Sequence, residues 1–360
     1  MAKTKNTNKA NENQEGEPKK YKKALVVGAG AFGTSVATVL AQNFESVVLK
    51  VRSKDVYDAI LKGENSVYLP GLPIPENLYP ALDWEEVDAH GQEDYQLIVS
   101  GLPTAGITQF YEENYVRFTR YFEDGVPLVS LSKGIDPDTL EMADDLFYEL
   151  FNKYRELFTF LSGPSFAKEI MMEQITLATL AGRDRDVIVQ VTQMLEAPFF
   201  KCLGSYDVKG VLLGGALKNV IAIAGGIIEG LGYNHNTRAA MITRAIAEML
   251  RFGRVFSARS ETFYGLSGMG DLILTTTGGL SRNKTFGLEI AKGRSPEEII
   301  QGQRTVVEGY KTAKAAYHLA EKYKIRARIF QGVYKVLYEG ANAKEVIEQM
   351  MRVPSKFEID

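Results

Sequence analysis

The sequence predicts an α/β fold in which a doubly wound, mostly parallel sheet is followed by an all-helical C-terminal domain. In the first half, short runs rich in Val, Ile and Leu alternate with segments of helical periodicity, as in a parallel sheet covered on both faces. After Tyr206, apolar residues recur at three- and four-residue steps. A chain of 360 residues also exceeds one typical domain. We therefore expect a polar tail at 1–22, an α/β domain at 23–206 and a helical domain at 207–360.

The individual elements follow from the same patterns. The segment 67–80 contains four prolines and is predicted to be an irregular loop. Asp207 is expected to cap a long helix that runs through Lys218 toward Glu229. The expected strands are 23–28, 46–51, 95–103, 126–134, 158–164, 175–182 and 199–205, and the expected helices are 31–43, 104–115, 138–154, 184–195, 237–253, 308–324 and 330–340.

The composition excludes several classes of protein. A net charge of −3 gives no general attraction to nucleic acid or to an anionic membrane. Cys202 is the only cysteine, so no intrachain disulfide can form, and the three histidines lie far apart in the sequence. No metal site is therefore expected.

Two segments bear on localisation. Residues 1–22 lack the apolar run of a secretory signal, and we interpret them as a solvated tail. The segment 210–228 is apolar, but Lys218 and Asn219 stand in its middle, so we interpret it as a buried helix rather than a membrane span. These features predict a cytoplasmic protein.

A glycine motif lies between the first expected strand and the first expected helix. Gly28, Gly30 and Gly33 form G-x-G-x-x-G, in which the glycines allow a tight turn, close approach of a pyrophosphate and close packing of helix on strand. The helix N-terminus adds unpaired N–H groups and partial positive charge. The strand–turn–helix context predicts a dinucleotide site, and the alternative is a glycine turn that only lets the helix pack.

The end of the second expected strand bears on the choice of cofactor. Arg52 stands where an NAD site usually has Asp or Glu. An arginine can instead pair with the 2′-phosphate of NADP, although a solvated surface arginine is an equal alternative. We predict use of both NADPH and NADH, with NADPH preferred.

Several polar residues stand where a ligand is expected. Lys133 and Ser165 follow strand-like runs, and ligands lie beyond the carboxyl ends of such strands. Lys218 lies in an otherwise apolar helix, where burial would lower its pKa and suit it to proton donation; the alternative is a lysine that reaches solvent at a helix end. Asp271 is a candidate counter-charge for Lys218.

Two further features complete this set. Ser281, Arg282 and Asn283 form a compact group of donors that could hold a phosphate, and the alternative is a polar surface loop. The pairs Gly214–Gly215 and Gly225–Gly226 weaken a helix, so they imply the close approach of another segment.

Six motifs in order resemble the bacterial-type NAD(P)-dependent glycerol-3-phosphate dehydrogenases: GAGAFGT, SKGID, SGPSFAKE, ALKNVIAIAGGIIEGLGYNHNTRAAMITRAIAEM, GMGDLILTTT and SRNKTFG. They extend from about Lys23 to about Gly340. The resemblance implies a Rossmann-type domain, a helical domain and an active site between them. It also implies the reversible, NAD(P)H-dependent reduction of dihydroxyacetone phosphate to sn-glycerol 3-phosphate, which supplies glycerophospholipid synthesis. We also consider a homodimer as the oligomeric state.

The resemblance also implies roles for individual residues. Lys218 matches the proton-transfer lysine. The remaining substrate contacts would be Lys133, Gly163, Ser165, Asp271, Ser281, Arg282 and Asn283. The cofactor contacts would be Gly28, Gly30, Ala31, Phe32, Gly33, Arg52, Lys133, Ala167, Arg282, Val306 and Glu308. One departure is that TTTGGLSRN lacks a cysteine often found after its first threonine.

Two other functions compete with this one. The first is a dinucleotide sensor without chemistry, against which the joint presence of Lys133, Lys218, Asp271, Arg282 and Asn283 argues. The second is a related two-domain reductase that acts on another small acid or phosphate.

Overall fold

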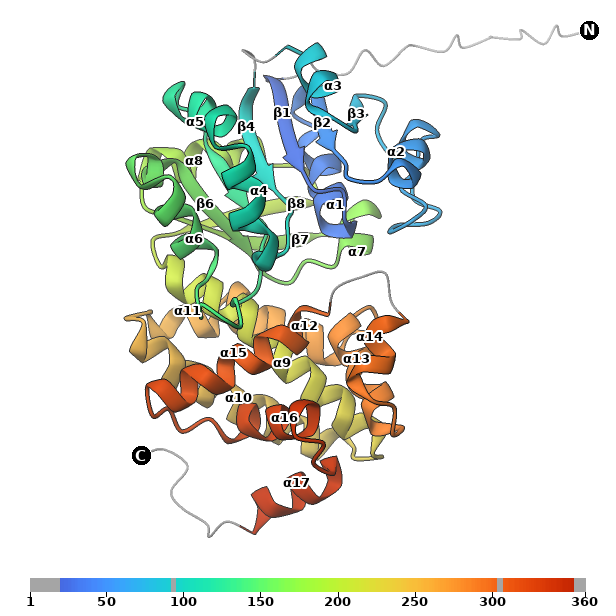
Figure 1. Cartoon of the computed structure of the whole chain (residues 1–360), viewed down its shortest axis with the longest axis vertical. Coiled ribbons are helices and arrows are strands. Elements are labelled where there is room, and N and C mark those ends of the chain that lie inside the picture. The colour runs from blue at the N-terminus through green and yellow to red at the C-terminus, as the bar shows by residue number, and fades with distance from the viewer. Residues whose placement is uncertain (1–19, 92–94, 303–306, 353–360) are drawn as a thin grey trace, which may run out of the picture.

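The computed structural model describes residues 20–91, 95–302 and 307–352. An eight-stranded sheet with the order β3-β2-β1-β4-β5-β6-β7-β8 forms the N-terminal half, and a block of helices forms the other half (Figure 1). The strands are β1 (Tyr21–Val27), β2 (Phe44–Lys50), β3 (Leu78–Ala81), β4 (Tyr95–Ser100), β5 (Leu128–Ser130), β6 (Phe158–Ser162), β7 (Thr176–Gly182) and β8 (Phe200–Ser205). Only the β6–β7 pair is antiparallel among these strands. The predicted fold class is confirmed.

Two strands of this half differ from the prediction. β1 begins at Tyr21, so two residues of the expected tail belong to the sheet, and residues 1–19 lie outside the described part. The loop at 67–80 ends in β3, which the prolines concealed. Pro80 is compatible with a strand because β3 is at the edge of the sheet, where a missing N–H breaks no ladder.

Helices connect the strands and cover the sheet. The expected helix at 104–115 is instead a short 3-10 turn and two helices that meet at Asn114, and the helix expected at 138–154 begins only at Ala143. The preceding residues form a turn in which the Asp136 carboxylate accepts from the amides of Asp138 and Thr139. The helices are α1 (Ala31–Leu40), α2 (Lys54–Leu61), α3 (Trp84–Ala89), α4 (Ile107–Glu113), α5 (Tyr115–Glu123), α6 (Ala143–Leu150), α7 (Ala167–Met171) and α8 (Arg185–Met194).

The C-terminal half is built around the long helix α9 (Val208–Gly230). The Asp207 carboxylate caps α9 by accepting from the amide of Gly210 at 3.0 Å, as predicted. The other elements are α10 (His235–Val255), α11 (Ser260–Tyr264), the π-helical turn η4 (Leu266–Gly270), α12 (Asp271–Thr277), α13 (Arg282–Ala291), α14 (Pro296–Gln301), α15 (Glu308–Lys322), α16 (Arg328–Tyr338) and α17 (Ala343–Met351).

The apolar helix α9 is the core of this half. Within the described ranges it is the one helix with the length and hydropathy of a membrane span, but its apolar stretch is wholly buried inside the protein. A single hydrophobic cluster joins α9 to one face of the sheet through Phe158 and Phe160. The division into domains at 206/207 stays a prediction.

Glycines let other segments approach the α9 backbone. A Cβ on Gly226 would lie 2.0 Å from the carbonyl oxygen of Lys284, and a Cβ on Gly287 would lie 2.1 Å from that of Ile223. Similarly, a Cβ on Gly214 would lie 2.6 Å from the carbonyl oxygen of Ser267. The close approach expected from the glycine pairs is confirmed, and α9 and α13 pack backbone to backbone.

Candidate active site

The turn after β1 has the geometry of a phosphate cradle. Gly28 has φ +101°, which favours glycine, and a Cβ on Gly33 would lie 2.0 Å from the carbonyl oxygen of Gly28. Gly30 differs, because no heavy atom lies within 4 Å of the place where its Cβ would be. Open space therefore faces the N-terminus of α1, whose first turn contains no acidic residue. This cradle fits the pyrophosphate of a dinucleotide.

The other expected cofactor residues surround this cradle. Ala31 and Phe32 open α1, and Ala167 opens α7, which packs against α1. Arg52 is exposed after β2 and forms no ion pair within the described residues, whereas nearby Lys54 is paired with Asp58. The expected residue Val306 lies outside the described residues, and Glu308 is the first residue of α15.

Lys218 lies at the centre of the site. Its side chain projects from the middle of α9 and is buried, with the whole residue 7% exposed. Its Nζ donates to Oδ1 of Asp271 at 2.5 Å and to Oγ1 of Thr275 at 3.0 Å. Burial lowers the pKa of Lys218 to about 8, although the carboxylate of Asp271 opposes this shift. A lysine with such a pKa can give up a proton near neutral pH.

A second lysine shares the same carboxylate. Lys133 follows β5, and its Nζ donates to Oδ2 of Asp271 at 3.1 Å, to the carbonyl oxygen of Gly163 at 3.1 Å and to Oγ of Ser165 at 3.3 Å. The same Nζ lies 5.1 Å from the ring centroid of Phe32. Asp271, which is 1% exposed, therefore bridges one lysine from each half of the protein.

The site has an excess of positive charge. Two lysines share the carboxylate of Asp271, and Arg282 lies exposed at the start of α13 with no ion pair inside the described ranges. Burial raises the pKa of the Glu308 carboxyl, although Arg282, Lys218 and Lys133 oppose this shift. An anionic ligand would balance the surplus of positive charge.

The three polar residues around the start of α13 have distinct positions. The Ser281 hydroxyl caps α13 by accepting from the amide of Lys284 at 3.2 Å. Asn283 donates to Oδ1 of Asn219 at 2.9 Å and accepts from the amide of Gly309 at 3.0 Å, so it joins α9, α13 and α15. Of the three, Arg282 has the side chain that forms no hydrogen bond or ion pair within the described residues.

Two residues of this network were missed by the sequence analysis. Asn219 donates to the carbonyl oxygen of Lys133 at 3.2 Å, and Thr275 donates both to the backbone oxygen of Asp271 at 2.6 Å and to its Oδ1 at 3.1 Å. The signals were available, because Asn219 follows Lys218 directly and Thr275 stands one helical turn after Asp271.

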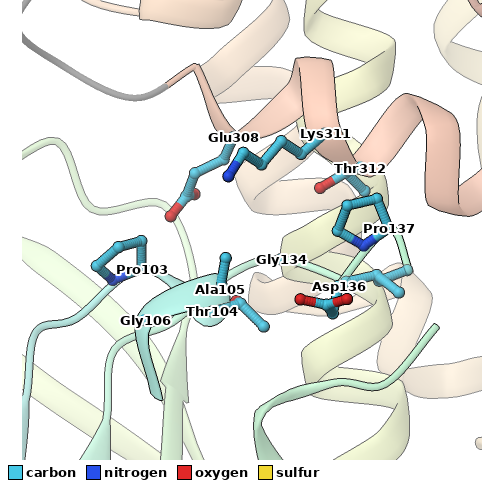
Figure 2. Close-up of a pocket in the computed structure, with 11 residues that line it drawn as sticks. Pro103, Thr104, Ala105, Gly106, Gly134, Asp136, Pro137, Glu308, Lys311 and Thr312 are labelled. Carbon is cyan, nitrogen blue, oxygen red and sulfur yellow. The ribbon is translucent and has the colours of Figure 1, made fainter. Parts of the chain in front are cut away.

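A cavity of about 230 Å³ lies where the two halves meet. Figure 2 shows Glu308 and Lys311 extending from α15 toward Pro103 and Ala105, which follow β4. Gly134 and Asp136, next to Lys133, line the same space. No group of three His, Cys, Asp or Glu side chains in the described part of the chain could hold a metal ion.

The comparisons with known proteins agree with this geometry. The family model for the N-terminus of NAD-dependent glycerol-3-phosphate dehydrogenase matches residues 23–188, and the model for its C-terminus matches residues 207–348. The chain is 39% identical over 337 residues to glycerol-3-phosphate dehydrogenase [NAD(P)+] of Syntrophotalea carbinolica, covering 93% of this chain and 99% of the relative. It is 40% identical over 339 residues to the protein of the same name in Myxococcus xanthus, covering 93% and 98%. The solved structure of glycerol-3-phosphate dehydrogenase from Coxiella burnetii superimposes with a TM-score of 0.79 at 29% identity, covering 92% of this chain and 99% of that one.

Proposed function

The chain belongs to the NAD-dependent glycerol-3-phosphate dehydrogenase family, and we propose that it reduces dihydroxyacetone phosphate reversibly to sn-glycerol 3-phosphate with NAD(P)H. The observation that carries this proposal is the carboxylate of Asp271 between Lys133 and Lys218. It places a proton donor with a lowered pKa in a site with surplus positive charge. Both features suit the reduction of a phosphorylated ketone.

The chemistry divides between the cofactor and the side chains. When bound, the nicotinamide supplies a hydride to the ketone carbon. Lys218 gives its proton to the ketone oxygen as negative charge develops there, so hydride and proton together complete the alcohol. Asp271 orients the ammonium group of Lys218 and keeps it protonated, because a nearby carboxylate favours the charged form.

Binding of the phosphate and of the substrate backbone is assigned to the cationic and polar residues. Arg282 offers a planar, permanently charged fork that matches a phosphate. Lys133 binds the carboxylate oxygen of Asp271 that Lys218 does not, and Ser165 accepts from Lys133. Both residues follow strands, so we assign them to substrate contacts on the side of the sheet. Gly163, Ser281 and Asn283 are proposed to complete the substrate site.

The cofactor is proposed to lie across the glycine turn. Gly28, Gly30 and Gly33 hold the pyrophosphate at the N-terminus of α1, next to Ala31 and Phe32. Arg52 would pair with the 2′-phosphate, which supports a preference for NADPH. The remaining proposed contacts are Lys133, Ala167, Arg282, Val306 and Glu308.

The wider role is also part of the proposal. sn-Glycerol 3-phosphate is the backbone of glycerophospholipids, so we assign the enzyme to their supply and place it in the cytoplasm, where its single buried cysteine would stay reduced. A homodimer remains a prediction, which analytical ultracentrifugation tests.

A direct assay tests the proposed activity. The absorbance of the reduced cofactor is followed with dihydroxyacetone phosphate and either NADPH or NADH, with unphosphorylated dihydroxyacetone as the control. We expect oxidation of both cofactors with the phosphorylated substrate and much slower oxidation with the control. No oxidation of either cofactor would refute the proposed reaction.

A further inference from the structure

The carboxylate of Asp207 does more than cap α9. Besides the amide of Gly210, it accepts from the backbone amide of Arg259 at 2.8 Å and from Oγ1 of Thr262 at 2.6 Å. Thr262 belongs to α11, and Arg259 is the residue immediately before it. One largely buried carboxylate therefore joins the N-termini of two helices that are about 50 residues apart in the sequence.

The segment after α11 contacts α9 at Gly214, one helical turn after Gly210. A Cβ on Gly214 would lie 2.6 Å from the carbonyl oxygen of Ser267, which belongs to the π-helical turn η4. A Cβ on Gly268 would lie 2.3 Å from the carbonyl oxygen of Phe263, so η4 is also packed tightly against α11. Single π-helical turns are rare and occur frequently at functional sites.

A third contact completes the series. After η4 comes Asp271, whose carboxylate accepts from Lys218 at 2.5 Å. Gly210, Gly214 and Lys218 are four residues apart and therefore lie on one face of α9. The segment from Arg259 to Asp271 contacts the start of α9 at Asp207, then Gly214 and then Lys218, in the same order along both segments.

We propose that Asp207 is a positioning residue for the active site: its carboxylate fixes α11 and η4 on α9 and thereby holds Asp271 against Lys218. The kinetic part of this inference rests on the proposed function. Asp207 lies eleven residues before Lys218, and its carboxylate reaches the segment that contains Asp271 through Arg259 and Thr262.

The sharpest test replaces Thr262 by Val, which keeps the shape of the side chain and removes the hydroxyl donor. We expect kcat for reduction to fall at least about fivefold, because small misplacements of a catalytic group cost large factors in rate. The dissociation constant of NADPH, measured by fluorescence, should change far less than kcat, because the glycine turn proposed to hold the pyrophosphate lies in the other half. Thr262→Ser should restore the rate, and Ser260→Ala, an exposed neighbour on the same helix, is the matched control.

The pH profile separates positioning from a merely structural role. Lys218 is influenced by Asp271, Lys133 and Glu308, and of these Asp271 is the group that Asp207 holds through α11 and η4. A displaced Asp271 stabilises the ammonium group less, so the alkaline fall of the reduction rate should move to lower pH in Thr262→Val and in Asp207→Asn. If Thr262→Val does not fold, Asp207→Asn carries the same test.

The outcomes distinguish the two proposals. Wild-type protein without turnover refutes the proposed function. Wild-type turnover together with an unshifted pH profile in Thr262→Val overturns only the role of Asp207, even if the melting temperature falls. A lower kcat with a shifted alkaline limb, rescued by Thr262→Ser, supports it.

Discussion

Replacement of Lys218 by Met tests the proposed proton donor while it preserves most of the buried side-chain volume. Proton transfer by a positioned side chain contributes about a hundredfold to ten-thousandfold to rate, so we expect kcat to fall within that range. The wild-type rate of reduction should also decrease above about pH 8, where Lys218 loses its proton. The variant should lack this decrease.

The same change has a structural cost that can be worked out from the contacts. Removal of one member of a buried ion pair typically costs about 3–5 kcal/mol. Here Asp271 keeps the ammonium group of Lys133 at 3.1 Å and the hydroxyl of Thr275 at 3.1 Å. Because burial also disfavours the ammonium form of Lys218, and Met relieves that penalty, we expect the free energy of unfolding to fall by much less than this.

The assay combines steady-state oxidation of NADPH, denaturant unfolding and a matched control. Lys284→Met removes another buried lysine, which is paired with Glu229 at 3.0 Å and lies on α13. Because Glu229 is 37% exposed, this change should cost about 1 kcal/mol of stability and far less activity than Lys218→Met. A Lys218→Met enzyme with near-normal kcat at saturating substrate would refute the assigned role.

Three further predictions follow from other sites. Arg282→Ala should raise KM for dihydroxyacetone phosphate by about 10- to 150-fold, since a charged hydrogen bond contributes about 1.5–3 kcal/mol. The KM for unphosphorylated dihydroxyacetone should hardly change. Equal increases for both substrates would contradict the proposal that Arg282 binds the phosphate. Arg52→Ala should raise KM for NADPH and leave KM for NADH unchanged. Arg52→Asp should reverse the cofactor preference, because its carboxylate repels the 2′-phosphate. An equal increase in KM for both cofactors would contradict the pairing of Arg52 with the 2′-phosphate. The buried carboxyl of Glu248, which accepts from the amide of Ile329, has its pKa raised to about 7 by burial. The folded state therefore binds this proton more tightly than the unfolded chain does. The unfolding free energy of the wild type, measured relative to that of Glu248→Gln, should fall as pH rises from about 4.5 to about 7. If this difference between the two proteins stays constant with pH, Glu248 does not titrate in this range.

The sequence predicted the sheet well because buried parallel strands are continuous apolar runs. It missed β3 because that strand is short, lies at the edge and contains Pro80. The prediction of one helix at 104–115 was wrong because the spacing of apolar residues gives no sign of a break. In the structure α4 ends at Glu113 and α5 begins at Tyr115.

The sequence indicated most of the residues that meet around Asp271, but not how they are arranged. Lys218 stood out as a charge in an apolar helix, and the glycine turn followed from its context between strand and helix. That one carboxylate, Asp271, serves lysines from both halves depends on how α9 packs against the sheet and against η4. Such contacts between distant segments have no periodicity that a sequence could display.

The backbone contact between α9 and α13 determines which parts of the site can move. A side chain at Gly226 or at Gly287 would collide with the backbone of the opposite helix, and we expect helices packed this closely to move as one body. Lys218 and Arg282 belong to these two helices, whereas Lys133 follows strand β5. We therefore expect the backbone spacing between the proposed proton donor and the proposed phosphate anchor to stay constant if the two halves of the enzyme move, whereas the distance between Lys133 and Asp271 would change.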